Sequence, residues 1–137
     1  VPLFVDAFNE TVKGIDCKFS VHICYSDYSL LYPDLLEMKT DHLAFEYANK
    51  KNYDDLKLFK EYGDKREIGL GVLDVHSNEI ETPEVVRDRL LYAHNLLEEN
   101  EIYASPDCGF RTRSLDVAFK KLSNLVRGAQ LARENLS

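Results

Sequence analysis

The sequence predicts an α/β fold in which parallel strands alternate with helices. Short apolar runs are followed by segments of helical periodicity four times along the chain, with roughly 30 residues in each strand–helix unit. No linker, low-complexity tract or internal repeat divides the 137 residues, and this length is typical of one domain. We therefore expect a single domain over residues 1–137.

The N-terminal half of the chain is expected to begin with an amphipathic helix. Gly14 ends this helix, as a glycine of left-handed conformation commonly does, and Gly63 ends a later one. The apolar stripe of the first helix consists of Leu3, Phe4, Ala7, Phe8 and Val12. A strand, a short helix, a second strand and a second longer helix are then predicted over 19–24, 32–38, 43–48 and 53–62.

The C-terminal half is predicted to hold two strands, each followed by a helix. Thr82-Pro83-Glu84 is a strong helix start, with a capping hydroxyl, proline at the first helical position and an acid in the first turn. That helix is expected to run to about residue 99, and Ser114 is expected to cap the last one. The two strands span 68–73 and 102–105. The helices carry apolar stripes of Val86, Leu90, Ala93 and Leu97, and of Leu115, Ala118, Leu122, Leu125, Val126 and Ala129.

Two closed architectures are built from such units, a doubly wound sheet and a (β/α)8 barrel. The first strand is not followed by a glycine-rich phosphate turn, which weakens the dinucleotide-binding form of the doubly wound sheet. Four units are half of a barrel, whose usual length is about 250 residues. Half a barrel leaves two strand edges that something must cover.

Composition and charge exclude several classes of protein. The net charge of −7 and the lack of a basic cluster argue against a nucleic-acid surface. No apolar run approaches the roughly 18 residues of a membrane span. Three cysteines do not make a secreted disulfide framework, so we expect a reducing cytoplasm. The chain opens on Val1-Pro2 without Met, which suggests a piece of a longer polypeptide, although N-terminal processing would look the same.

Groups that bind metals or move protons stand at the end of every predicted strand, where parallel α/β folds place their functional residues. His22 and Cys24 are two residues apart on one strand, so their side chains should project from the same face. The four strand ends carry, in chain order, His22 with Cys24, Glu46, Asp74 with His76, and Asp107 with Cys108.

A His, a Glu and two Cys that converge from three strands would complete a tetrahedral zinc site. A nucleophilic Cys–His pair is an alternative, but it explains neither Glu46 in an apolar strand nor the second cysteine, Cys108. A third possibility is that His22 and Cys24 are simply buried residues without a chemical role. We expect Cys17, at the start of its strand, to serve in packing.

Three segments, VHICYS, IGLGVLDVHS and SPDCGFRTR, resemble in order and spacing the C-terminal catalytic barrel of cobalamin-independent methionine synthase, the 5-methyltetrahydropteroyltriglutamate–homocysteine methyltransferase. The resemblance covers almost the whole chain and implies the zinc-bearing C-terminal half of a (β/α)8 TIM barrel. It implies that His22, Cys24, Glu46 and Cys108 ligate zinc and that His76 donates a proton.

The implied reaction is transfer of a methyl group to the thiol of homocysteine, which yields methionine. Two thiolates, a carboxylate and a neutral imidazole leave a zinc site with a net charge of −1, which suits a nucleophilic thiolate better than hydroxide formation. Methyltetrahydrofolate, in polyglutamate form, is the implied donor. Glu46-Tyr47-Ala48-Asn49 departs from the common bacterial pattern and resembles shorter, often archaeal relatives, so a methylcorrinoid is the alternative donor.

Several roles have a second explanation. Asp74 is expected to orient the ring of His76; judged without the resemblance, the two residues fit a helix-capping or loop-bracing pair equally well. Asp107 is expected to support the adjacent ligand or to cap a turn, and Arg111 and Arg113 have no assigned role. The alternative to an enzyme is a non-catalytic zinc-binding fragment or subunit. We expect the isolated chain to be inactive and to require its N-terminal half-barrel or a second copy.

Overall fold

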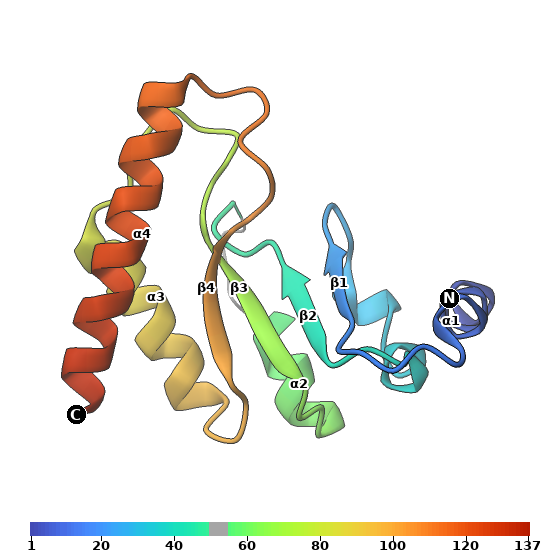
Figure 1. Cartoon of the computed structure of the whole chain (residues 1–137). Helices are drawn as coiled ribbons and strands as arrows, with labels where there is room; N and C mark the ends of the chain where they lie inside the picture. Colours follow the sequence, from blue (N-terminus) through green and yellow to red (C-terminus); the bar gives the residue numbers. More distant parts are fainter. Residues whose placement is uncertain (50–54) are drawn as a thin grey trace.

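A single parallel sheet forms the centre of the molecule. The computed structural model of the protein describes residues 1–49 and 55–137. The strands, in the order β1-β2-β3-β4 across the sheet, all run parallel to their neighbours (Figure 1). They are β1 (Ser20–Ile23), β2 (His42–Phe45), β3 (Glu67–Leu73) and β4 (Ile102–Pro106). The predicted α/β fold with parallel strands is confirmed.

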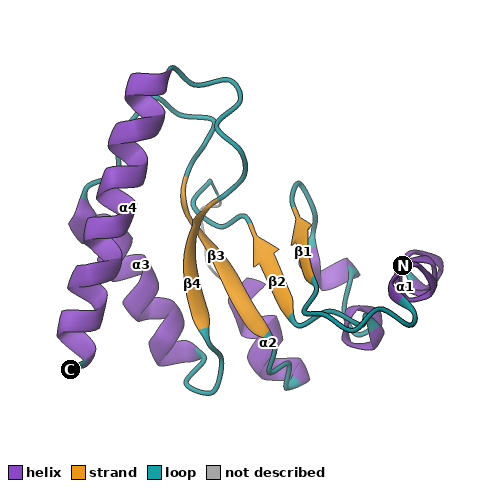
Figure 2. Cartoon of the chain, viewed as in Figure 1, coloured by secondary structure: helices purple, strands orange, loops and turns teal. Residues whose placement is uncertain are grey.

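Helices lie beyond both edge strands of the sheet, β1 and β4 (Figure 2). The α-helices are α1 (Pro2–Val12), α2 (Leu56–Tyr62), α3 (Pro83–Leu96) and α4 (Leu115–Leu136). Two short 3-10 helices, η1 (Tyr28–Leu30) and η2 (Asp34–Glu37), follow β1. Helices α3 and α4 pack against each other next to β3 and β4, whereas α1 lies on the far side of β1 (Figure 1). Within the described residues, no helix is both long enough and apolar enough to cross a membrane.

The chain caps its helices as the sequence predicts. The Thr82 hydroxyl accepts a hydrogen bond from the N–H of Val85, and Ser114 does the same for Val117. Gly63 ends α2 in the left-handed conformation at φ 65°, which a residue without a Cβ adopts at little cost.

Some predicted bounds are wrong. The helix expected over 32–38 is replaced by the two 3-10 helices, because Pro33 lacks an N–H and restricts the residue before it. Helix α3 ends at Leu96 and not near 99, and β2 ends at Phe45, so Glu46 lies in the loop after the strand. Residues 53 and 54 of the helix predicted over 53–62 lie outside the described residues.

The core lies around β3, which is flanked by strands on both sides. Every residue of β3 after Glu67 is buried, as expected of an interior parallel strand. The largest fully buried apolar side chains come from η1, β2, α2 and β3 and the segments next to them: Tyr28, Leu35, Leu43, Phe45, Tyr47, Leu56, Phe59, Ile68, Leu70, Val72 and Leu73.

Several apolar residues predicted to be buried are exposed. On α4, Leu115 is 90% exposed, and Leu122 and Val126 are also exposed, because this side of the helix faces no other described element. Leu3 and Phe4 of α1 are exposed in the same way. The expectation that Cys17 serves in packing is also wrong, since this residue precedes β1 in an exposed turn.

Helices α3 and α4 approach closely at Gly128. A Cβ placed on Gly128 would lie 2.5 Å from Cβ of Val86 and 2.7 Å from the carbonyl oxygen of Pro83. We therefore expect Gly128→Ala to lower the free energy of unfolding by about 1–3 kcal/mol, despite the better helix propensity of alanine. Ser123→Ala, at an exposed position of α4, is the matched control. Chemical denaturation checks this, and an unchanged stability of Gly128→Ala would contradict the packing described.

Candidate metal centre

The structure brings together His22, Cys24 and Cys108. The imidazole of His22 and the two thiols each offer a ligand atom, and these atoms all lie within 4.8 Å of one another. His22 belongs to β1, Cys24 directly follows it, and Cys108 follows β4. In a flat sheet the first and fourth strands would be roughly 14 Å apart, at about 4.8 Å per strand. The segments beyond the strand ends must therefore converge, as Figure 1 shows for the loop after β4.

Glu46 lies beside this cluster. Its side chain is almost completely buried, at 3% exposure. One carboxylate oxygen accepts the N–H of Tyr25, the residue after Cys24, at 2.6 Å. The other accepts the side-chain amide of Asn49 at 3.4 Å. The Glu46 carboxylate is not one of the donors that meet within 4.8 Å, but it is hydrogen-bonded to the segment that carries one of them.

The cluster concentrates groups that become negative when they ionise. Burial raises the pKa of the Cys24 thiol, and the neighbouring Cys108 and Glu46 groups raise it further. Each of these groups disfavours a second negative charge in its surroundings. A bound cation would offset this crowding, as it does where thiols ligate metals.

Asp107 joins the loop after β4 to the loop after β2. Its side chain is fully buried, and one oxygen accepts the N–H groups of Tyr47 and Ala48 at 2.8 Å, while the other accepts that of Asn49 at 2.9 Å. Burial raises the pKa of Asp107 to about 6, the three N–H groups lower it, and the charge of Glu46 raises it. Asp107 thus fixes the segment that follows Glu46 against the segment that carries Cys108.

Gly71 provides the space for this carboxylate. A Cβ on Gly71 would lie 2.2 Å from Oδ1 of Asp107 and 2.6 Å from the carbonyl oxygen of Phe45. Sequence reasoning did not single out this residue. The available signal was a glycine inside an otherwise apolar strand, which often marks a close approach of other atoms to the backbone.

Asp74 and His76 follow β3 and do not belong to the cluster of His22, Cys24 and Cys108. Oδ1 of Asp74 accepts the backbone N–H of His76 at 2.8 Å, a contact that fits the loop-bracing explanation. The imidazole of His76 instead meets Tyr25, whose hydroxyl oxygen lies 2.6 Å from Nε2. Tyr25 itself has a left-handed backbone, with φ 53°, which is uncommon for an aromatic residue. No residue pattern along the chain predicts the contact between Tyr25 and His76.

The two arginines after Cys108 differ. Arg113 donates from Nη1 to the side-chain oxygen of Asn78 at 2.8 Å and so links the loop after β4 to the loop after β3. Arg111 is exposed.

Comparisons with known proteins show which family the sequence matches. The model of the family described as cobalamin-independent synthase, catalytic domain, matches residues 6–131. A methionine synthase of Sulfurisphaera tokodaii is 41% identical over 132 residues, which are 96% of this chain and 38% of the relative. A methionine synthase of Saccharolobus islandicus is 39% identical, over 96% of this chain and 40% of the relative. The chain therefore spans about two fifths of these archaeal relatives.

A solved structure shows the same fold. The B12-independent methionine synthase from Shewanella sp. W3-18-1, in complex with selenomethionine, superposes with a TM-score of 0.82 and 25% sequence identity. The match covers 98% of this chain and 46% of that protein, so the four-stranded sheet corresponds to part of a TIM barrel. With the family model covering nearly the whole sequence, the chain belongs to the catalytic-domain family of the cobalamin-independent synthases.

Proposed function

We propose that this chain is the metal-bearing part of a zinc-dependent methyltransferase that methylates the thiol of homocysteine to form methionine. The observation that carries the proposal is the meeting of one imidazole and two thiols within 4.8 Å. The names of the archaeal relatives, which are methionine synthases, support the proposed reaction, and the donor set supports zinc as the metal.

The residues fit zinc. At zinc–sulfur and zinc–nitrogen bond lengths of about 2.0–2.3 Å, the donors of a tetrahedral site lie roughly 3.6 Å apart, so His22, Cys24 and Cys108 need only small side-chain movements. Glu46 is the proposed fourth ligand, since its buried carboxylate already contacts the backbone next to Cys24. Asp107 supports the site by holding the loop of Glu46 against that of Cys108.

Bound zinc would hold the substrate sulfur as a thiolate that remains nucleophilic. Removing the methyl group from the tertiary amine of methyltetrahydrofolate leaves a nitrogen anion, which must be protonated because it is a poor leaving group. We propose that Nε2 of His76 delivers this proton and that Asp74 supports it through the backbone N–H of His76. A methylcorrinoid is the alternative donor and leaves no nitrogen anion, so transfer from it would not require the imidazole.

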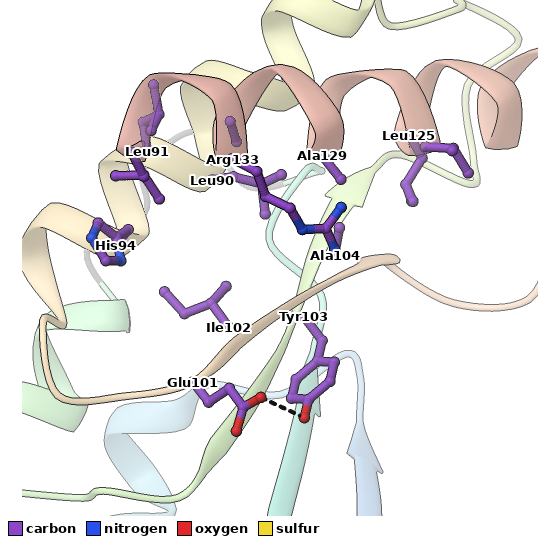
Figure 3. Close-up of a pocket in the computed structure, with 13 residues that line it drawn as sticks. Leu90, Leu91, His94, Glu101, Ile102, Tyr103, Ala104, Leu125, Ala129 and Arg133 are labelled. Atoms are coloured by element: carbon purple, nitrogen blue, oxygen red, sulfur yellow. Dashed lines mark hydrogen bonds between the residues drawn. The ribbon is translucent and has the colours of Figure 1, made fainter.

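The rest of the barrel is proposed to cover the open sides of this sheet. No described strand pairs with the outer edges of β1 and β4, and a cavity of about 500 Å³ lies between β4, α3 and α4 (Figure 3). None of the proposed metal or proton-transfer residues lines this cavity. We propose that an N-terminal half-barrel, or else a second copy of the chain, completes the structure and that the chain alone is inactive. The free thiols fit a cytoplasmic protein.

Zinc X-ray absorption with and without homocysteine tests whether the metal is catalytic. In the complete barrel, we expect the zinc to gain a sulfur ligand when homocysteine is added, because a catalytic zinc exchanges one of its ligands for the substrate or expands to five-coordinate. Serine at the same concentration, with a hydroxyl in place of a thiol, is the control. An unchanged spectrum at saturating homocysteine would contradict catalysis and favour a zinc that only holds the loops together.

A further inference from the structure

A buried ion pair lies behind the loop that carries His76. Lys121 of α4 has a fully buried side chain, which is rare for lysine. Its Nζ donates to Oε2 of Glu81 at 2.6 Å and to the carbonyl oxygen of Asp74 at 2.9 Å. Glu81 lies in the segment that leads into α3, and its own carbonyl oxygen accepts the side-chain amide of Asn124 at 2.7 Å. The pair thus connects α4 to the end of β3.

Both members of the pair bond the backbone of the same residue. Oε1 of Glu81 accepts the N–H of Asp74 at 2.7 Å, while Lys121 donates to the carbonyl oxygen of Asp74. These two contacts fix the peptide groups on either side of the Asp74 Cα. The side chain of Asp74 is then placed to accept the N–H of His76, whose Nε2 contacts Tyr25. An unbroken series of contacts therefore runs from α4 to the imidazole.

We propose that Lys121 and Glu81 are positioning residues that hold His76 in place through the backbone of Asp74; the functional part of this inference rests on the proposed role of His76. An ion pair that only stabilised the fold would have no need to bond both peptide groups of one loop residue. A buried pair is also a poor source of net stability, because apolar residues of similar volume often replace it without loss. Its contacts therefore make it suited to fixing one loop geometry.

Amide hydrogen exchange, followed residue by residue by NMR, tests the proposal. In Lys121→Met we expect the N–H groups of Asp74 and His76 to exchange roughly tenfold faster or more, because their acceptors are no longer held. The reference amides are those of Tyr47 and Ala48, which Asp107 binds on another loop. The exchange rates of these reference amides should change by less than about twofold.

Lys120→Met is the matched control. Lys120 is the neighbouring lysine of α4, and it is exposed and pairs with Asp116 on its own helix. The Lys120→Met variant should leave the exchange rates of all of these amides unchanged. Glu81→Gln is a second variant in case Lys121→Met does not fold: a glutamine amide must turn a donor towards Lys121 or towards the N–H of Asp74, so one contact is lost. The exchange at Asp74, His76 or both should then accelerate.

The outcomes separate this inference from the proposed function. If exchange at Asp74 and His76 is unchanged in Lys121→Met, the positioning role of Lys121 and Glu81 is overturned. Equal acceleration at the reference amides would also overturn it, because it would show a general loss of stability. In the complete enzyme, we expect Lys121→Met to lower kcat while the zinc content and the KM for homocysteine stay unchanged. Local acceleration with an unaltered kcat would leave the structural coupling intact and contradict the role of His76 in the reaction.

Discussion

Replacing Cys108 by Ser is expected to lower the affinity of the chain for zinc by roughly 100-fold or more, since even residues that only support a ligand commonly cost 10–100-fold. The thiol of Cys108 is one of three donors that meet within 4.8 Å, and it alone comes from the loop after β4. A hydroxyl does not ionise near neutral pH and is a poor ligand for zinc. The loss should leave His22, Cys24 and Glu46 as an incomplete site.

Cys17→Ser is the matched control for this experiment. Cys17 is an exposed free cysteine that does not belong to the cluster, so its removal should leave zinc affinity unchanged. Competition with a chromophoric chelator measures both variants under the same conditions. Equal zinc affinity of the Cys108→Ser variant and the unaltered chain would contradict the proposed ligand set.

Asp107→Ala is expected to lower the free energy of unfolding by about 1–3 kcal/mol, the cost of leaving the buried N–H of Tyr47 without an acceptor; the N–H groups of Ala48 and Asn49 are only partly buried and add less. The carboxylate is fully buried and accepts the N–H groups of Tyr47, Ala48 and Asn49. The loop after Glu46 should therefore lose its attachment to the loop after β4.

Chemical denaturation in the presence of a chelator measures this effect without a contribution from bound metal. Asp107→Asn is the matched control, because its side-chain oxygen can still accept from Tyr47 and Ala48 while its amide faces the N–H of Asn49. We expect this variant to lose less stability than Asp107→Ala. A change below about 1 kcal/mol in the alanine variant would fall within ordinary surface effects and contradict the account.

The order of the strands and helices could be predicted because local patterns determine it. Thr82 and Ser114 cap their helices, and the apolar run of β3 is buried in the middle of the sheet. The period of a strand also predicts that His22 and Cys24 share a face, and the two side chains do belong to one cluster. Cys108 joins them because parallel strands end at the same edge of a sheet.

The contacts that hold the site in place could not be predicted, since they join residues far apart in the sequence. Lys121 lies beside an apolar stripe of α4, and its partner Glu81 is 40 residues away. The need for a glycine at Gly71 depends on the position of Asp107, which belongs to a different strand end. The exposure of Leu115 also follows from which elements face α4, and the periodicity of a helix does not contain that information.

The number of sulfur atoms bound to the metal tests the central claim most directly. The chain is loaded with one equivalent of zinc, without added thiol, and the zinc K-edge X-ray absorption spectrum is recorded. We predict two sulfur ligands, from Cys24 and Cys108, together with lighter atoms from His22 and Glu46. A shell of nitrogen and oxygen alone would contradict the account, because the two thiols would then not bind the metal.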